Sequence, residues 1–466
     1  MIKQPTFLKK KDKPIVCVQG LGFVGIAMMI AVASRLMDKK NIFNVIGVEL
    51  DNQSGREKVK QLNSGVLPIK TTDKKLKQFF KRTYNKKNFF TSTDNKFIKY
   101  ADVIISDINL DLKKSKNKFL VDYSNFVLAM KTLGKHMKEN ALVIVETTLP
   151  PGTSEKLAIP IINKERMKRG FTKELMFAFS YERVMPGNNY MNSIINFWRV
   201  YSGNTKKASD KCANFYKKVV NTKKFPLTRL NNLSSCETSK ILENSYRAVN
   251  IAFIDEWSRF AENIGIDLYE VINAIKVRPT HSNIMLPGLG VGGYCLTKDP
   301  LFGLISAEQL FKKKYLKFPL SKKSVEINNE MPQASVDILE KYLKTLNKKK
   351  ILILGLSYRP DTDDTRYSPS TDFAKRLITK GAKIYGHDPL VSSWEGFEKC
   401  RIKSLNNIPQ VDAIVLAVAH KNYKTLKISK FKNKTKIILD ANNILSKNER
   451  NKMRLNKLKY ISLGRN

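Results

Sequence analysis

Cysteine is scarce in this chain, and no two cysteines lie close together. The five residues Cys17, Cys212, Cys236, Cys295 and Cys400 are odd in number and include no CxxC pair. This spacing argues against a disulfide framework and against a zinc site. The sequence therefore predicts free thiols, no bound metal and a reducing, cytoplasmic compartment.

Acidic side chains are also few. The chain has 41 Asp and Glu against 84 Lys and Arg, which gives a formal net charge of +43. Such an excess suits nucleic acid, an anionic membrane surface or a small polyanion. The basic residues are scattered and interleaved with Asn, not gathered on one helix or one aromatic-rich strand. We expect most of them to be solvated surface and expect no specific nucleic-acid partner.

Long uncharged runs are rare, and one segment needs an explanation: the twenty residues IVCVQGLGFVGIAMMIAVAS at 15–34, which follow a basic tail. A membrane anchor is one interpretation. However, Gln19 and three glycines at GxGxxG spacing interrupt the run, and no small-residue cleavage site follows it. A buried strand followed by a buried helix explains the run better than a membrane anchor does, so we expect no membrane insertion.

Strands and helices alternate in two series along the chain of 466 residues, which is long enough for two or three domains. Such alternation predicts parallel sheets covered on both faces. We therefore predict an α/β protein with two doubly wound, Rossmann-like domains at 1–222 and 336–466, joined by a helical domain at 223–335. The predicted strands lie at 15–20, 44–50, 102–108, 141–148, 175–180, 198–203, 351–356, 383–388, 412–418 and 436–442.

The helical domain is predicted to contain one long central helix, from residue 240 until Gly265 interrupts the pattern. Ser234 with Glu237 fits a capping box just before it. The apolar residues at helical spacing are Leu242, Tyr246, Val249, Phe253, Trp257, Phe260 and Ile264.

Three polar residues of this helix, Lys240, Asn244 and Arg247, lie one turn apart on the side away from the apolar stripe. They face either solvent or a site, and the periodicity alone favours solvent.

The motif CVQGLGFVGIA places Gly20, Gly22 and Gly25 between a strand and a helix, where a dinucleotide pyrophosphate can bind helix N–H groups. The next strand ends at Glu49, 24 residues beyond Gly25, where a carboxylate accepts hydrogen bonds from the adenine ribose. An acid there favours NAD over NADP. Glu49 is preferred to Asp51 because it lies in register at the strand's end; the alternative is that both only border a loop.

The segment LPGLGVGGYCLTKDP at 286–300 places Cys295 directly after four glycines in six residues and four positions before Asp299. Glycines allow positive φ and close approach of the backbone to another surface. The segment is either a loop built around a reactive cysteine or a glycine-rich loop with a buried thiol.

Six motifs occur in order over nearly the whole chain: GLGFVG (20–25), ETTLPPGT (146–153), SYERVMPGN (180–188), KILENSYRAVNIAF (240–253), PGLGVGGYCLTKDP (287–300) and GLSYRPDTDDTRYSPS (355–370). With these motifs the chain resembles the NAD-dependent UDP-sugar 6-dehydrogenases, the family of UDP-glucose and UDP-N-acetylhexosamine dehydrogenases. The resemblance implies oxidation of the C6 hydroxymethyl group of a UDP-hexose to a carboxylate, with two NAD+ consumed.

The resemblance also implies the catalytic residues. Cys295 is the nucleophile, whose thiolate forms a thiohemiacetal and then a thioester. Its glycines allow the backbone to approach the hexose. Lys240 stabilises the oxyanion at C6, Asn244 donates a hydrogen bond to it, and Asp299 takes part in proton transfer or orients Lys240 and a water. Thr148 and Glu182 match the water-positioning pair, with Glu182 as the base.

Binding residues follow from the same resemblance. Arg359 pairs with phosphate, Arg278 reaches the sugar from a neighbouring subunit, and the family's assembly through its central helix implies a homodimer or larger oligomer. The implied cofactor contacts are Gly20, Gly22, Phe23, Val24, Gly25, Glu49 and Thr148. The implied substrate contacts are Glu182, Arg183, Val184, Lys240, Asn244, Arg247, Arg278, Gly292, Tyr358 and Arg359.

The sugar is predicted from the SYERV motif, where Met185-Pro186-Gly187 stands in place of the second acid of UDP-glucose enzymes. This resembles the UDP-N-acetylhexosamine branch, whereas Tyr294 and Lys298 depart from it. Lys298 either binds a phosphate or the developing charge, or faces water. The alternatives are a UDP-glucose 6-dehydrogenase, a dehydrogenase-like UDP-sugar sensor, or a basic nucleic-acid or membrane-surface protein on a dehydrogenase scaffold. Arg366 either binds ligand or is structural, paired with the aspartates near it.

Overall fold

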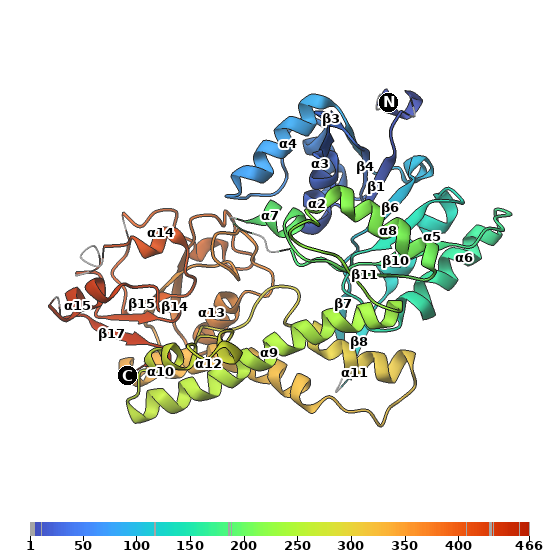
Figure 1. Cartoon of the computed structure of the whole chain (residues 1–466). Helices are drawn as coiled ribbons and strands as arrows, with labels where there is room; N and C mark the ends of the chain where they lie inside the picture. Colours follow the sequence, from blue (N-terminus) through green and yellow to red (C-terminus); the bar gives the residue numbers. More distant parts are fainter. Residues whose placement is uncertain are drawn as a thin grey trace. The chain divides into compact units, whose positions relative to one another are not determined.

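The computed structural model describes residues 5–10, 12–115, 118–184, 187, 189–406, 408–427, 431, 433–455 and 457–465. Met185 and Pro186, used above to predict the sugar, lie outside the described residues. The chain forms two compact units, shown in Figure 1 with the element labels used below. The first unit consists of Met1–Leu242 and Leu301–Lys317, and the second of Glu243–Pro300 and Phe318–Asn466.

The first unit is built on an eight-stranded sheet of order β12-β11-β10-β9-β6-β1-β4-β5. Its strands are β1 (Ile15–Gln19), β4 (Asn44–Val48), β5 (Phe89–Ser92), β6 (Val103–Ser106), β9 (Leu142–Val145), β10 (Met176–Phe179), β11 (Val200–Gly203) and β12 (Thr228–Arg229). Every strand predicted before residue 205 is present, whereas β5 and β12 were missed. Two small hairpins, β2 (Leu36–Met37) with β3 (Lys40–Asn41) and β7 (Asp111–Ser115) with β8 (Lys118–Asp122), complete the strands.

One strand direction differs from the prediction of a parallel sheet. β11 runs antiparallel to β10, with Phe179 opposite Ser202, whereas the other adjacent pairs of this sheet are parallel. A short apolar run indicates a buried strand but carries no information about its direction, so the pattern could not predict this reversal.

The strand order of this sheet reverses at β1. β1 pairs with β4 on one side and β6 on the other. The chain proceeds from β1 to β4 and β5 on one side and then crosses to β6 on the other, so the strand order reverses at β1. In doubly wound sheets, ligands usually bind outside the carboxyl ends of the strands at such a reversal.

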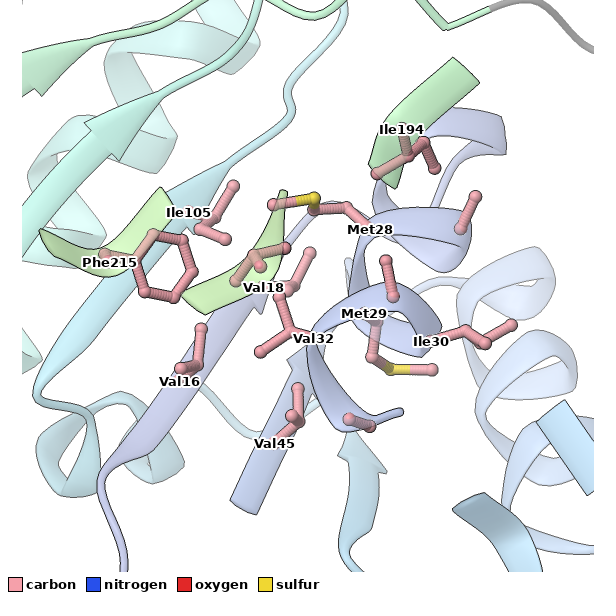
Figure 2. Packing of buried hydrophobic residues seen from close by; sticks show 14 of the residues in the cluster. Val16, Val18, Met28, Met29, Ile30, Val32, Val45, Ile105, Ile194 and Phe215 are labelled. Carbon is pink, nitrogen blue, oxygen red and sulfur yellow. The ribbon is translucent and has the colours of Figure 1, made fainter. Parts of the chain in front are cut away.

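The core of the first unit explains the uncharged run at 15–34. The run forms β1 and then α2 (Phe23–Ala33), whose residues from Gly25 to Ala33 are all buried. A helix that is apolar all round must be covered on all sides, and α2 contacts β1, β4, α4 and α7. Figure 2 labels residues of this core: Val16, Val18, Met28, Met29, Ile30, Val32, Val45, Ile105, Ile194 and Phe215.

Among the described helices, none combines the length and apolar character needed to cross a membrane. The remaining helices of the first unit are α1 (Phe7–Lys10), α3 (Gln53–Asn63), α4 (Lys74–Lys86), α5 (Ser124–His136), α6 (Ile159–Met167), α7 (Tyr190–Ile195), α8 (Lys206–Val219) and α11 (Phe302–Ile305), with the short turns η1 (Asn95–Tyr100), η2 (Ser154–Ala158) and η5 (Ser306–Leu310).

The second unit contains a five-stranded parallel sheet of order β14-β13-β15-β16-β17, with an apolar cluster on each face. Its strands are β13 (Lys350–Leu354), β14 (Lys383–His387), β15 (Ala413–Leu416), β16 (Ile437–Asp440) and β17 (Lys459–Ser462), of which β17 was not predicted. Its helices are α10 (Leu268–Ile275), α12 (Pro319–Leu343), α13 (Pro369–Thr379), α14 (Lys421–Lys424) and α15 (Lys447–Leu455), with the short turns η3 (Pro279–His281) and η6 (Glu398–Cys400).

The long central helix is α9 (Leu233–Ile264), 32 residues that belong partly to each unit. It begins before the predicted capping box, because Asn232 Oδ1 accepts the N–H of Ser235 at 2.7 Å. The capping box is therefore wrong: Ser234 Oγ donates to Glu155, and Glu237 binds other backbone groups described below.

Periodicity favours a buried apolar stripe and solvent-exposed polar residues on α9, and the structure shows largely the reverse. Lys240 and Asn244 are buried, so solvent is the wrong alternative for both, whereas Arg247 is exposed. The apolar stripe is the exposed side, and Val249 within it is half-buried. Its exposed members are Leu242, Tyr246, Phe253, Trp257, Phe260 and Ile264.

Candidate active site

The glycine-rich turn after β1 has the geometry that a dinucleotide needs. Gly20 lies at φ +92, and a Cβ on Gly25 would stand 1.9 Å from the Gly20 carbonyl oxygen. A Cβ on Gly22, by contrast, would meet nothing within 4 Å. The first glycine thus makes the turn, the third allows close helix packing, and the second leaves open space at the N-terminus of α2. These residues fit the pyrophosphate of NAD.

Glu49 lies beside this turn. Its Oε2 accepts the Leu21 N–H at 3.0 Å and pairs with Lys58 Nζ at 3.1 Å. Asp51, the alternative, pairs with the exposed Arg56 at 2.6 Å instead. The carboxylate predicted for the ribose is therefore at the turn, and its bond to the ribose stays a prediction. The partner Lys58 was not predicted.

The predicted groups Lys240 and Glu182 lie together in the first unit. Lys240 Nζ donates to the backbone carbonyl of Glu182 at 2.8 Å and lies 5.3 Å from the ring centroid of Tyr181. The Glu182 carboxylate accepts the backbone N–H of Val184. Arg183 Nη2 donates to Tyr181 Oη at 3.0 Å. The segment SYERV is thus folded against α9 at Lys240.

Thr148 follows β9 and is half-buried. A buried charged cluster that was not predicted follows the same strand. Glu146 Oε1 accepts from Arg199 Nη1 and from Tyr216 Oη, both at 2.5 Å. Burial raises the pKa of Asp107 well above its usual range, and the carboxylates of Glu146 and neighbouring Glu182 raise it further. An acid near the end of a predicted strand, Glu146 within 141–148, was the only sequence signal for this cluster.

Glu237 connects the ETTLPPGT motif to α9. Its carboxylate accepts the backbone N–H of Gly152 at 2.6 Å and that of Ser154 at 2.8 Å. Burial raises the pKa of Glu237 to about 8. Because Glu237 lies about one turn before Lys240 on α9, it fixes the turn after Thr148 relative to that lysine.

Cys295 is the exposed cysteine of the second unit. Cys17, Cys212 and Cys236 are buried, and burial raises the pKa of each of these thiols. The alternative of a glycine-rich loop with a buried thiol is therefore wrong. Only an accessible thiol can meet a substrate, so Cys295 has the access that a nucleophile requires.

The glycines before Cys295 were predicted to let the backbone approach another surface closely. In the structure, that surface is another segment of the same chain. A Cβ on Gly292 would stand 2.6 Å from the Tyr367 carbonyl oxygen and 2.7 Å from Tyr358 Cβ. Gly293 lies at φ +81, and its Cβ would stand 2.6 Å from the Tyr358 ring. The cysteine loop is therefore packed directly on the segment that carries Tyr358 and Arg359; its approach to a hexose stays a prediction.

Asp299 is fully buried and held by two side chains. Lys298 Nζ lies 2.7 Å from Oδ1, and Asn244 Nδ2 donates to Oδ2 at 2.8 Å. Lys298 also lies 4.5 Å from the ring centroid of Tyr294. Lys298 is buried, so the alternative that it faces water is wrong. The structure brings Asn244 and Asp299 together, and the lysine that pairs with Asp299 in this unit is Lys298.

The predicted substrate arginines differ in their surroundings. Arg359 is half-buried, whereas Arg247 and Arg278 are exposed. For Arg366, the structural alternative is confirmed, because its guanidinium forms a bidentate pair with Asp364 at 3.0 and 2.7 Å.

The predicted site residues therefore form two groups. The first unit holds Gly20, Gly22, Phe23, Val24, Gly25, Glu49, Thr148, Glu182, Arg183, Val184 and Lys240. The second holds Asn244, Arg247, Arg278, Gly292, Cys295, Asp299, Tyr358 and Arg359. Closeness of Cys295 to Lys240 stays a prediction from the sequence.

Comparison with known proteins gives matches over most of the chain. Three models of the UDP-glucose/GDP-mannose dehydrogenase family match: the NAD binding domain at residues 15–220, the central domain at 234–330 and the UDP binding domain at 352–447. The chain is 30% identical over 452 residues to the UDP-N-acetyl-D-mannosamine dehydrogenase of Pyrococcus horikoshii, covering 92% of this chain and 96% of that protein. It is also 30% identical to the enzyme of the same name from Methanocaldococcus jannaschii, covering 93% of each.

Solved structures agree with these matches. The structure of UDP-D-ManNAc dehydrogenase from Pyrococcus horikoshii superimposes with a TM-score of 0.81 at 28% identity, covering 97% of this chain and 99% of that one. A UDP-glucose dehydrogenase from Pyrobaculum islandicum has a TM-score of 0.80 at 22% identity, covering 97% and 98%, which is a likeness of fold alone.

Proposed function

Because the chain belongs to the UDP-glucose/GDP-mannose dehydrogenase family and is an NAD-dependent UDP-sugar dehydrogenase, we propose that its substrate is a UDP-N-acetylhexosamine. The observation that carries this proposal is that nearly full-length relatives at 30% identity are named UDP-N-acetyl-D-mannosamine dehydrogenases. The product is the corresponding uronic acid, a precursor for polysaccharide synthesis.

The proposed reaction proceeds through the sulfur of Cys295. Bound NAD+ accepts the hydride that each oxidation removes. The first oxidation converts the C6 alcohol to an aldehyde, and the Cys295 thiolate then forms a C–S bond to that carbon. Loss of the second hydride gives a thioester. Water cleaves the C–S bond, which releases the carboxylate and returns the thiol. The exposure of Cys295, against the burial of Cys17, Cys212 and Cys236, supports this assignment.

Other side chains are proposed to stabilise the charge that develops at C6 and to transfer protons. Lys240 and Asn244 stabilise the C6 oxyanion, and Glu182, with Thr148, positions and deprotonates the hydrolytic water. The bonds of Asp299 to Lys298 and Asn244 support a role as a fixed carboxylate that orients Asn244 and transfers a proton.

The nucleotide end is assigned to the second unit. Arg359 pairs with a phosphate and Tyr358 lies beside it, supported by the match of the UDP binding domain to residues 352–447. The further substrate contacts are proposed as Arg183, Val184, Arg247, Gly292 and Arg278, the last from a neighbouring subunit. The three family matches support a division into an NAD-binding domain at 1–222, a central domain at 223–335 and a UDP-sugar-binding domain at 336–466.

A homodimer formed through α9 is part of the proposal. The stripe of exposed aromatic and aliphatic side chains along this helix supports it, because a contiguous apolar surface of this kind is typical of an interface. A second copy of the chain presents the same stripe and so is a self-complementary partner.

The test is a panel of UDP-N-acetylglucosamine, UDP-N-acetylmannosamine, UDP-N-acetylgalactosamine and UDP-glucose, with NADH absorbance as the readout. We expect one of the three N-acetylhexosamines to have a kcat/KM at least about 100-fold above that of UDP-glucose, because a pocket that hydrogen-bonds the acetamido group rejects an analogue without it. UDP-glucose as the preferred substrate would contradict the proposal.

A further inference from the structure

His420 lies fully buried in the second unit, outside all the residues assigned to the reaction. It follows β15, and its Nε2 lies 3.0 Å from Asp388 Oδ2, which follows β14, and 3.2 Å from Ser357 Oγ, which follows β13. Its Nδ1 lies 2.9 Å from the backbone nitrogen of Asp361. One imidazole therefore joins the loops at the carboxyl ends of three adjacent strands.

The Asp388 carboxylate is a fixed anion at the base of this network. Its oxygens accept the backbone N–H groups of Leu356 at 2.8 Å and Ser357 at 3.2 Å, besides the bond with His420. Although burial opposes ionisation, the bond from His420 and those from backbone N–H groups lower the pKa of Asp388 to about 2. Asp388 is therefore an acceptor only.

Counting donors assigns the tautomer of His420. The Asp361 N–H needs an acceptor at Nδ1, so Nδ1 carries no proton and Nε2 carries it. The Nε2–H points to Asp388 and Ser357 Oγ, while the Ser357 hydroxyl donates to the Arg359 carbonyl at 2.9 Å. The network thus binds both ends and the centre of the loop 357–361.

This loop is the one that carries Tyr358 and Arg359, and its conformation needs support. Asp361 lies at φ +60, in the left-handed region that residues other than glycine rarely adopt. The His420 Nδ1 bond holds the N–H of that same residue, and Asp361 Oδ1 accepts the Lys421 N–H at 3.2 Å. Without the imidazole, the loop loses the hydrogen bond that holds the N–H of Asp361.

We propose that His420 is a positioning residue for nucleotide binding: through Ser357 and Asp361 it holds the loop 357–361 in the conformation that presents Arg359 and Tyr358 to the UDP group. This inference rests on the proposed function only in assigning Arg359 to a phosphate. His420 acts through the loop and does not touch the substrate.

The test compares His420→Gln with Tyr423→Phe. Gln keeps a donor for Asp388 but cannot also place an acceptor at the Asp361 N–H. Tyr423 is a matched control because it is equally buried and its hydroxyl bonds His387 Nδ1 and O, both at 2.8 Å, with no bond to the loop 357–361 among the described residues. Binding of UDP alone is measured by calorimetry, beside steady-state kinetics and melting temperature.

We expect His420→Gln to weaken UDP binding about ten-fold and to raise KM for the UDP-sugar similarly, with kcat and KM for NAD+ within two-fold of wild type. Tyr423→Phe should lower the melting temperature comparably and leave UDP affinity within two-fold. Unchanged UDP affinity in His420→Gln, or an equal loss in Tyr423→Phe, would overturn the proposal.

Ser357→Ala provides a second variant if His420→Gln fails to fold. It removes the bond to the Arg359 carbonyl and is expected to weaken UDP binding about three-fold; unchanged affinity would count against the proposal. Because UDP binding is read without sugar or NAD+, the result is independent of which sugar the enzyme oxidises. A protein that binds UDP normally but oxidises no UDP-N-acetylhexosamine would refute the proposed substrate and leave this inference standing.

Discussion

The chemistry proposed for this enzyme depends on a few residues whose surroundings differ from those of other residues of the same type. Cys295 is exposed while Cys17, Cys212 and Cys236 are buried, and Asp299 is buried but held by Lys298 and Asn244. Composition cannot distinguish these residues. The sequence indicated Cys295 through its glycines, and the structure adds the pair of Lys298 with Asp299, which was not predicted.

The glycines of the dinucleotide turn allow a test of single positions. Gly22→Ala places a methyl group in open space, so we expect the free energy of unfolding to change by less than about 1 kcal/mol. The methyl then occupies the space assigned to the pyrophosphate, and KM for NAD+ should rise about ten-fold. Gly25→Ala is the control, because its Cβ would collide with the Gly20 carbonyl oxygen at 1.9 Å and should destabilise the fold by roughly 1–3 kcal/mol or more.

Melting temperature and NAD+ kinetics measure these two effects separately. If Gly22→Ala keeps the wild-type KM for NAD+, the turn does not hold the pyrophosphate. If Gly25→Ala has the melting temperature of the wild type, residue 25 does not pack against the Gly20 carbonyl as closely as described.

Glu237 predicts a dependence of stability on pH. Its pKa rises from a usual value near 4.5 to about 8 in the folded chain, so between these values the folded state binds a proton that the unfolded state has lost. The contribution of Glu237 to stability is therefore full below about 4.5 and decreases as pH rises towards 8, by roughly 1.4 kcal/mol per pH unit.

Glu237→Gln has no proton to lose and isolates this effect. Denaturation of both proteins at pH 5.5, 6.5 and 7.5 should show the wild type losing stability relative to Glu237→Gln at each step. A constant difference between the two proteins across this range would contradict the raised pKa.

At the scale of elements, every strand predicted from the sequence is present in the structure. These strands could be predicted because buried strands of parallel sheets are short apolar runs in the sequence. The sequence missed β5, β12, β17 and the four short strands β2, β3, β7 and β8, and it could not predict the reversed direction of β11. The long helix was found, but its apolar stripe is exposed rather than buried, since periodicity identifies an apolar face and not what covers it. In the chain alone that face of α9 is open.

A substitution on this face tests the proposed dimer. Trp257 is 46% exposed on α9, and burial of a large apolar side chain contributes about 1.5–3 kcal/mol to an interface. We expect Trp257→Glu to convert the oligomer largely to monomer in size-exclusion chromatography with light scattering. Met167→Glu, at an exposed position of α6, is the control and should keep the wild-type mass. A monomeric wild type, or a dimer unaffected by Trp257→Glu, would contradict assembly through α9.

At the scale of the whole molecule, the family and the α/β architecture could be predicted from six ordered motifs, whereas many contacts of the site could not. The pair of Glu146 with Arg199 joins positions far apart in the sequence, and no local pattern encodes it. The network of His420 was missed for the same reason, because Ser357, Asp388 and His420 come from three separate strand ends.

The net charge of +43 did not predict a polyanion-binding function, because the basic residues are distributed over the whole chain. A positive surface still favours the approach of a doubly charged UDP-sugar, which suits the dehydrogenase as well as it suits a nucleic-acid protein. The motifs, and not the charge, distinguish these functions.

The central claim is that one enzyme site oxidises C6 twice through a covalent bond to Cys295, and counting NADH tests it most directly. A limiting amount of the preferred UDP-N-acetylhexosamine is converted to completion with excess NAD+, and NADH is measured per sugar for the wild type and for Cys295→Ala. We predict two NADH per sugar for the wild type and no uronic acid from Cys295→Ala. One NADH per sugar in the wild type, or full uronic acid formation by Cys295→Ala, would contradict the account.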